Sequence, residues 1–235
     1  MNLSCGKFSK IADGCCVASV GNTNVMVAAV SKSKNTCAAF MPLTVDYREK
    51  SSAAGRIPTN HLRRELAPSE REVLVSRLID RSVRTSFPPG FFGDTQLSCN
   101  LLSVDSVHDP DVVSINAASA ALTLSNIPWD GPVGAVRVAL LDNDVVVNPT
   151  RREMLHSNFN LVVTTKENKN VVMMEGNCKE PVTLNDLLKL IKRAQKENQT
   201  IIREIKKLEH SLQVAKRPVE RLYEPTQEQV EDTRV

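Results

Sequence analysis

Two β-rich runs near the N-terminus, CCVASV and NVMVAAVS, are separated only by Gly21, Asn22 and Thr23. A connection this short joins antiparallel neighbours, because parallel strands need a crossover of a dozen or more residues. Residues 15–31 are therefore predicted to form a β-hairpin, and a third strand is expected at 40–47. The chain thus begins with antiparallel pairing.

The first helix is predicted from its N-terminal cap. Ser69 stands three residues before Glu72, the spacing of a capping box, and an apolar stripe follows until the Pro-Pro-Gly at 88–90. A second, alanine-rich helix is expected from Val112 to Ser125, with Asp111 as its cap.

A long amphipathic helix is predicted near the C-terminus. Thr183 with Asp186 marks its start, and apolar residues recur at helical spacing up to Leu212. Because this length exceeds that of most globular helices, a break is expected near 198–199.

The remaining β-rich runs complete an α+β pattern of irregularly alternating elements. They lie at 95–105, 133–141, 145–147, 159–165 and 171–175. We expect one mixed β-sheet packed with helices on one side. Residues 1–180 are assigned to a main domain, 181–216 to the helix that closes it, and 217–235 to the start of a truncated helical linker region.

Composition excludes several classes of protein. The 235 residues are 41% hydrophobic, enough to bury a core, and no run approaches the roughly 18 apolar residues of a membrane-spanning helix, so no membrane insertion is expected. The six cysteines lack a paired Cys-x-x-Cys spacing, which favours free thiols over a zinc site. The four histidines also lack metal-ligand spacing.

Positive charge is concentrated in one segment. The net charge is only +3, but residues 48–84 hold nine basic and five acidic residues. The densest basic pair, Arg63 and Arg64, lies in SSAAGRIPTNHLRRELAP, whose glycine, proline and polar residues indicate a loop.

Several long motifs occur in one order along the chain: PLTVDYREKSSAAGRIPTNHLRRE, SEREVLVSRLIDRSVR, SVDSVHDPDVVSINAASAALTLSNIPWDGPVGAVRV and NPTRREM. Together they resemble the N-terminal half of the polynucleotide phosphorylases, across residues 5–175. The IPTN and IPWDGPVGAVR variants are more similar to animal mitochondrial members than to bacterial ones.

The resemblance implies a ribonuclease PH-like fold, two such halves per chain and a homotrimeric ring around a pore. It implies phosphate-dependent shortening of single-stranded RNA from its 3′ end, and the reverse polymerisation, with Mg²⁺ or Mn²⁺ and inorganic phosphate in the intact enzyme. That chemistry belongs to the second half, which is the expected partner of this one. A mitochondrial location is implied, and a cytoplasmic one is the alternative.

This half is predicted to be non-catalytic and to hold no metal. Where the resemblance places a glycine-rich phosphate cradle, the chain has Val107-His108-Asp109-Pro110-Asp111, whose carboxylates would repel phosphate. The positions of two catalytic carboxylates fall on Met154 and Asn160. Asp109 and Asp111 could instead bind a metal, but the cap is the preferred role of Asp111, and the neighbouring Glu153 is expected on the surface.

RNA contact is predicted first at His61, Arg63 and Arg64, which match a pore loop of the family that usually has two aromatics before two arginines. The arginines can bind phosphates, whereas most base stacking is lost with the aromatics. Further predicted RNA-binding residues are Arg56, Arg77, Arg81 and Arg84. An ion-pair network with Asp80 is an equal alternative for the last three, and the basic C-terminal helix is interpreted as a solvated face.

Three hypotheses follow. The first is a non-catalytic, RNA-binding and ring-forming half of a polynucleotide phosphorylase. The second is a stand-alone, exosome-like ring subunit that acts as a scaffold. The third is an active phosphorolytic enzyme that uses Asp109, Asp111 and Glu153.

Overall fold

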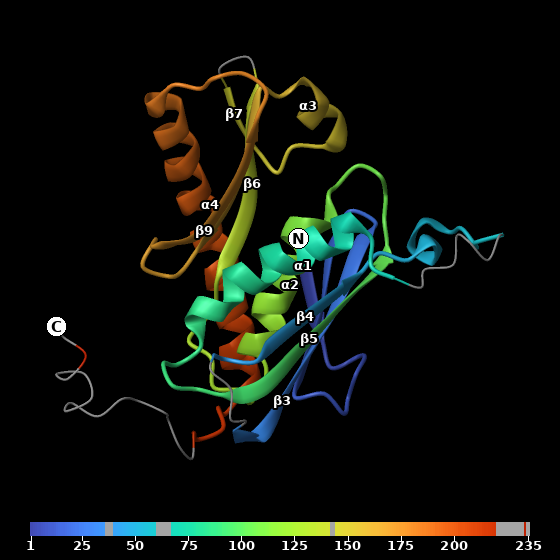
Figure 1. The fold of residues 1–235 in the computed structure, drawn as a ribbon, viewed down its shortest axis with the longest axis vertical. Coiled ribbons are helices and arrows are strands. Elements are labelled where there is room, and N and C mark those ends of the chain that lie inside the picture. Colours follow the sequence, from blue (N-terminus) through green and yellow to red (C-terminus); the bar gives the residue numbers. More distant parts are fainter. Residues whose placement is uncertain (36–39, 60–66, 142–143, 220–232, 234–235) are drawn as a thin grey trace.

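The computed structural model describes residues 1–35, 40–59, 67–141, 144–219 and 233, and its strands form two sheets (Figure 1). The first sheet has the order β1-β2-β3-β5-β4, and only the β4–β5 pair is parallel. Its strands are β1 (Asn2–Cys5), β2 (Gly14–Val20), β3 (Thr23–Asn35), β4 (Leu43–Arg48) and β5 (Gly93–Ser103).

The second sheet is antiparallel, with the order β7-β6-β8-β9. Its strands are β6 (Gly134–Leu141), β7 (Asp144–Val147), β8 (Phe159–Thr165) and β9 (Val171–Cys178). The predicted α+β class, with mixed β structure packed on helices, is confirmed. The expectation of one sheet is wrong, because the strands from Gly134 onward pair only among themselves in the described part of the chain.

The β2–β3 hairpin is confirmed, with Val20 paired to Thr23 across the turn. Gly21 has a φ of 57°, a conformation that side chains with a Cβ rarely adopt. A Cβ there would also lie 2.6 Å from a carboxylate oxygen of Asp105. The turn therefore needs glycine both for its backbone and for the approach of Asp105.

Helix α1 (Glu70–Val83) begins with the predicted capping box. The Ser69 hydroxyl accepts a hydrogen bond from the Glu72 backbone N–H, and the Glu72 carboxylate accepts one from the Ser69 backbone N–H. The same carboxylate accepts a 2.7 Å bond from the Glu49 backbone N–H, which ties α1 to the residue after β4. Short 3₁₀ turns at Ser51–Ala54 and Arg84–Ser86 flank this unit.

Helix α2 (Pro110–Thr123) is buried along its whole length, and its alanines and serines allow close approach on every side. It packs on β2 and β3 of the first sheet and on β6 of the second. The Asn116 amide donates to the Ala135 carbonyl and accepts from the Ala135 N–H, both at 2.9 Å. The helix therefore joins the two sheets into one core.

Helix α4 (Leu184–Leu212) begins at the predicted cap, where the Thr183 hydroxyl accepts from the Asp186 N–H. It is continuous over these residues, and Figure 1 shows its first turns beside the second sheet. The expected break near 198–199 is wrong, because the buried Asn198 side chain donates to the Val163 carbonyl of β8 at 2.9 Å. The polar residue bonds sideways to the sheet and leaves its own helix intact.

The chain after α4 returns to the core. The Lys216 ammonium donates to the carbonyls of Leu122, Thr123 and Ser125 at the end of α2, each at 2.9 Å. Residues 217–219 are not helical. The rest of the segment 217–235 lies almost entirely outside the described residues, so the helical linker region stays a prediction.

Two other sequence expectations concern thiols and membranes. The described cysteines are free thiols, as predicted, and Cys37 lies outside the described residues. Within the described part of the chain, no helix combines the length and apolarity needed to cross a bilayer.

Candidate functional site

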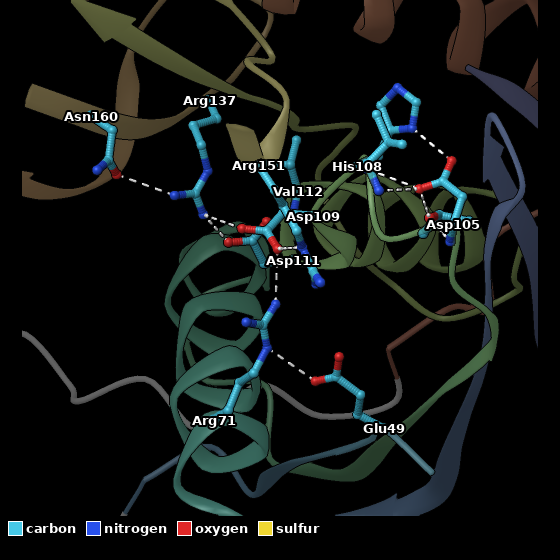
Figure 2. A network of polar contacts seen from close by, with 12 residues as sticks. Glu49, Arg71, Asp105, His108, Asp109, Asp111, Val112, Arg137, Arg151 and Asn160 are labelled. Carbon is cyan, nitrogen blue, oxygen red and sulfur yellow. Dashed lines mark hydrogen bonds and ion pairs between the residues drawn. The ribbon is translucent and has the colours of Figure 1, made fainter. Parts of the chain in front are cut away.

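A network of charged side chains surrounds the start of α2, at the place where an active family half is expected to hold phosphate (Figure 2). Its members come from α1, from β6 and β8, from α3 (Arg151–His156) and from the loop after β4. Asp109 is the N-cap residue of α2 by its extended backbone, but its carboxylate makes no capping bond. That carboxylate is free to face the neighbouring elements.

Asp109 is the centre of this network. Its carboxylate accepts a 3.0 Å bond from Nη2 of Arg71 on α1 and another 3.0 Å bond from Nε of Arg151 on α3. A nitrogen of Arg137 lies 3.9 Å away. Burial raises the pKa of this carboxyl, but the hydrogen bond from Arg71 and the charges of the three arginines outweigh burial, so the pKa lies below its ordinary value.

Asp111 forms a second, more deeply buried pair with Arg137 on β6. The other terminal nitrogen of Arg137 donates to the Asn160 side-chain oxygen on β8 at 3.1 Å. The expectation that Asp111 caps a helix beginning at Val112 is wrong. The helix begins two residues earlier, at Pro110, so Asp111 lies in its first turn and its carboxylate bonds to the Val112 N–H and to Arg137.

The charges of this network balance. Arg71 also donates to Glu49 at 3.0 Å, so three arginines face three carboxylates: Arg71, Arg137, Arg151, Glu49, Asp109 and Asp111. Beside them lies a cavity of about 120 Å³, lined also by His108 and Asn116. Guanidinium groups already bonded to carboxylates are poor phosphate ligands, since an incoming phosphate would have to displace an anion of the protein.

A second carboxylate fixes the loop that leads to the network. Asp105 accepts bonds from the Val107 and His108 backbone N–H groups, both at 2.9 Å, and from the Thr23 hydroxyl at 3.0 Å. Its other oxygen lies 2.8 Å from His108 Nδ1. Burial opposes ionisation of Asp105, but these bonds outweigh it and hold its pKa well below the ordinary value. The loop that supplies Asp109 is thus tied to the β2–β3 turn.

Met154 and Asn160 occupy the positions where the resemblance places two catalytic carboxylates. Asn160 accepts from Arg137, and Met154 lies half-buried on α3. Glu153 is exposed, as expected, and it also closes a capping box with Thr150 at the start of α3. Within the described residues, no group of three or more His, Cys, Asp or Glu side chains comes together as a metal-binding set.

The predicted RNA-binding residues are not brought together in the described structure. His61, Arg63 and Arg64 lie outside the described residues. Arg56 is exposed just after the 3₁₀ turn that begins this loop, and its backbone N–H donates to the Ser51 carbonyl.

The three predicted RNA-binding arginines on α1 and in the 3₁₀ turn after it have different surroundings. Arg84 donates to Asp80 and to the backbone carbonyls of Met41 and Leu43, so its donors are used inside the fold. Arg81 forms an ion pair with Glu175 on β9. Arg77 is exposed and has no carboxylate partner among the described residues. These contacts favour the ion-pair interpretation for Arg81 and Arg84.

Sequence reasoning missed the network because its arginines are far apart in the chain. One signal was present: Arg137 is the single charged residue of the apolar run GAVRVALL. A charge inside a buried strand needs a buried partner of opposite sign.

Family models match the chain over most of this architecture. The 3′ exoribonuclease family, domain 1, matches residues 1–128, and domain 2 of the same family matches residues 131–197. The chain belongs to the 3′ exoribonuclease family. In this family member, domain 1 corresponds to the first sheet with α1 and α2, and domain 2 to the second sheet with the first half of α4.

Curated relatives of this exoribonuclease-family chain are named polyribonucleotide nucleotidyltransferase. That of Methylacidiphilum infernorum is 47% identical over 176 residues, which are 74% of this chain and 25% of the relative. That of Methylobacterium nodulans is 49% identical over 179 residues, which are 76% of this chain and 25% of the relative. A mitochondrial one from rice is 44% identical over 189 residues, and the match covers 77% of this chain and 19% of the relative. The chain spans about a quarter of the length of the first two of these relatives and about a fifth of the third. The resemblance to polynucleotide phosphorylases is confirmed, and similarity to animal members stays a prediction.

Two solved structures share the fold of this family member. One is a chain of the Archaeoglobus fulgidus exosome with RNA bound to the active site, with a TM-score of 0.68 and 17% identity over 86% of this chain and 87% of that one. The other is from an archaeal exosome core, with the same TM-score and identity over 87% and 85%. At this identity the likeness shows the fold alone, and the predicted ribonuclease PH-like fold is confirmed.

Proposed function

We propose that this chain is the first ribonuclease PH-like half of a polynucleotide phosphorylase, which contributes RNA binding and ring assembly and does not itself catalyse. The whole enzyme would shorten RNA from its 3′ end with phosphate and polymerise nucleoside diphosphates in reverse. The observation that carries the non-catalytic role is the closed network at the start of α2, where every carboxylate has an arginine partner.

The metal and phosphate implied for the intact enzyme do not fit these residues. Asp109 and Asp111 are paired with arginines, and Asn160 offers only a neutral oxygen that Arg137 already uses. A divalent cation needs anionic oxygens that are free to ligate it, and phosphate needs cations whose charge is not already balanced by protein carboxylates. We therefore assign both requirements to the second half.

RNA binding is proposed for the loop that contains His61, Arg63 and Arg64, with Arg56 exposed at its start. Two neighbouring arginines can each bond a phosphate, and the missing aromatics would limit base contact. A mitochondrial location is part of the proposal, supported by one relative that is named mitochondrial. A homotrimeric ring, completed by the second half, is also part of it.

The catalytic part is tested by incubating the 235-residue chain with poly(A), phosphate and Mg²⁺, alone and with a separately expressed second half. We expect no release of nucleoside diphosphate from the chain alone. Release by the chain alone would overturn the non-catalytic role and favour a site built on Asp109, Asp111 and Glu153.

The RNA-binding part is tested by Arg63→Ala with Arg64→Ala. We expect weaker binding of single-stranded RNA and a slope of log K against log salt that is less steep by about 1.4, for two lost phosphate contacts. The matched control is Lys7→Ala with Lys10→Ala, which removes two positive charges from another exposed loop. If both double variants weaken RNA binding equally, the loop is not the RNA contact.

A stand-alone, exosome-like ring subunit is the second candidate, and the fold shared with the exosome chains favours it. Affinity purification of the tagged protein from its own cells separates the two. Recovery of the tagged chain joined to a second ribonuclease PH-like half supports the first proposal, and recovery with a separate catalytic protein supports the second.

A further inference from the structure

A basic groove of about 390 Å³ lies between α4 and the β8–β9 turn, and it shares no lining residue with the network. It is lined only by cationic and amide side chains: Lys169, Lys192, Gln195, Lys196, Gln199 and Arg203. All except Lys169 lie along one stripe of the helix at spacings of three, four and seven residues. We call these six side chains the α4 groove.

The turn between β8 and β9 forms the second wall of the α4 groove. The Gln195 amide donates to the Lys169 carbonyl and the Gln199 amide donates to the Lys166 carbonyl, both at 2.9 Å. Lys169 has a φ of 59°, a left-handed conformation that is costly for a long side chain. The two amide bonds hold the turn in this form and keep the Lys169 side chain at the groove.

The cations of the α4 groove have no carboxylate partner among the described residues. The nearby acidic side chains are bonded to other cations of the same region, in the pairs Lys189–Asp186, Arg193–Glu197, Lys206–Glu167 and Lys207–Glu204. Lys192 and Lys196 lie one helical turn apart, a spacing at which like charges repel each other. An external anion would remove this repulsion.

We propose that the α4 groove binds the phosphodiester backbone of single-stranded RNA, as a contact additional to the loop around Arg63 and Arg64. Lys192 and Arg203 are eleven residues apart, which is about 16 Å along a helix and beyond the reach of one phosphate group. A polymer with repeated phosphates fits this spacing. A protein partner fits less well, since protein interfaces have an apolar centre and few lysines, and this groove has many lysines and no apolar lining residue.

The chemistry of the groove also fixes the kind of binding. No aromatic ring lines it, so it offers no platform for stacked bases, and its ammonium and guanidinium groups recognise phosphates of any sequence. Binding should therefore depend strongly on salt and be equal for poly(A) and poly(U) of the same length.

The test compares two triple variants of the 235-residue chain. The groove variant is Lys192→Gln, Lys196→Gln and Arg203→Gln. The matched control is Lys189→Gln, Arg193→Gln and Lys207→Gln, which removes the same charge from the same helix at residues that have carboxylate partners. Binding of a fluorescent oligo(A) is measured by anisotropy over a series of salt concentrations, and helix content by circular dichroism.

We expect the groove variant to bind about ten- to a hundred-fold more weakly at 0.1 M salt, with a log–log salt slope less steep by about 2, and the control to change much less. Equal losses in both variants, or none in the groove variant, would overturn the proposal. Polyglutamate can be added as a competitor at the same charge concentration as the RNA. If it displaces RNA from the wild type but not from the groove variant, the proposal is overturned in favour of an acidic protein partner. If Arg63→Ala with Arg64→Ala weakens RNA binding and the groove variant does not, the groove inference is refuted, whereas the proposed RNA-binding role of the loop stands.

Discussion

The network at the start of α2 and the α4 groove each gather several cations, but they leave those cations in opposite states. In the network, each of three arginines bonds a carboxylate, and Asp111 and Arg137 are largely buried. In the groove, exposed lysines and an arginine stand beside carboxylates that other cations occupy. The two regions have a similar number of basic residues. Whether those residues are available to bind phosphate therefore depends on where the fold places the acidic side chains.

The largest expected effect is a loss of stability when an ion pair of the network is broken. Arg137→Met leaves the buried Asp111 carboxylate without its partner, and we expect a loss of about 3–5 kcal/mol in the free energy of unfolding. Urea denaturation followed by the fluorescence of Trp129, the only tryptophan and a buried one, measures it. Adding Asp111→Asn should restore part of the loss. The control Arg77→Met removes an exposed arginine and should cost under about 0.5 kcal/mol. A small effect of Arg137→Met would show that the network is open to water.

A smaller effect should depend on pH. The folded pKa of Asp109 lies below its ordinary value, so the ionised carboxylate favours the folded state. This stabilisation is fully present above the unfolded pKa of about 3.9 and is lost as pH falls through the folded pKa. Asp109→Asn should cost about 1.5–3 kcal/mol at pH 7, and the difference from wild type should shrink below about pH 4. A difference that stays constant from pH 7 to pH 3 would contradict the assignment.

The paired cations of α4 should matter least for stability. Lys189→Gln breaks a surface ion pair with Asp186, and such pairs contribute little to stability because water screens the two charges. The same urea titration should detect almost no change. A loss above 1 kcal/mol would mean that the acidic partners on α4 are structural, and would make the control triple variant unsuitable.

Added Mg²⁺ or phosphate provides a further test of the network. Mg²⁺ or phosphate in the millimolar range should leave the melting temperature unchanged, because each carboxylate of the network already faces an arginine and each arginine a carboxylate. Thermal melts followed by circular dichroism, with NaCl at equal ionic strength as the control, provide the measurement. A rise of several degrees with phosphate alone would show that the arginines of the network exchange their carboxylates for it.

Local features of the chain could be predicted from sequence, whereas features built from distant residues could not. The β2–β3 hairpin and the Ser69–Glu72 capping box were predicted correctly because their partners lie within a few residues. The role of Asp111 was missed because its partner, Arg137, lies 26 residues away on another element. The sequence also showed the cations of α4 as a single run. Three of them pair with carboxylates three or four residues away on the same helix, whereas the groove forms where another face of α4 meets the distant β8–β9 turn.

Helix α2 has a consequence for how such chains can be divided. The boundary between the two family domains, at 128–131, separates this helix from the strand that bonds it, because Asn116 pairs with Ala135 and the Ser119 hydroxyl with the backbone of Val133. A cut there would expose a helix whose every side is apolar or already bonded, and would remove one of the helices that pack on β6. We therefore expect the two family domains to unfold together, and an exchange of domain 2 between relatives to succeed only when Asn116 and Ser119 are exchanged together with it.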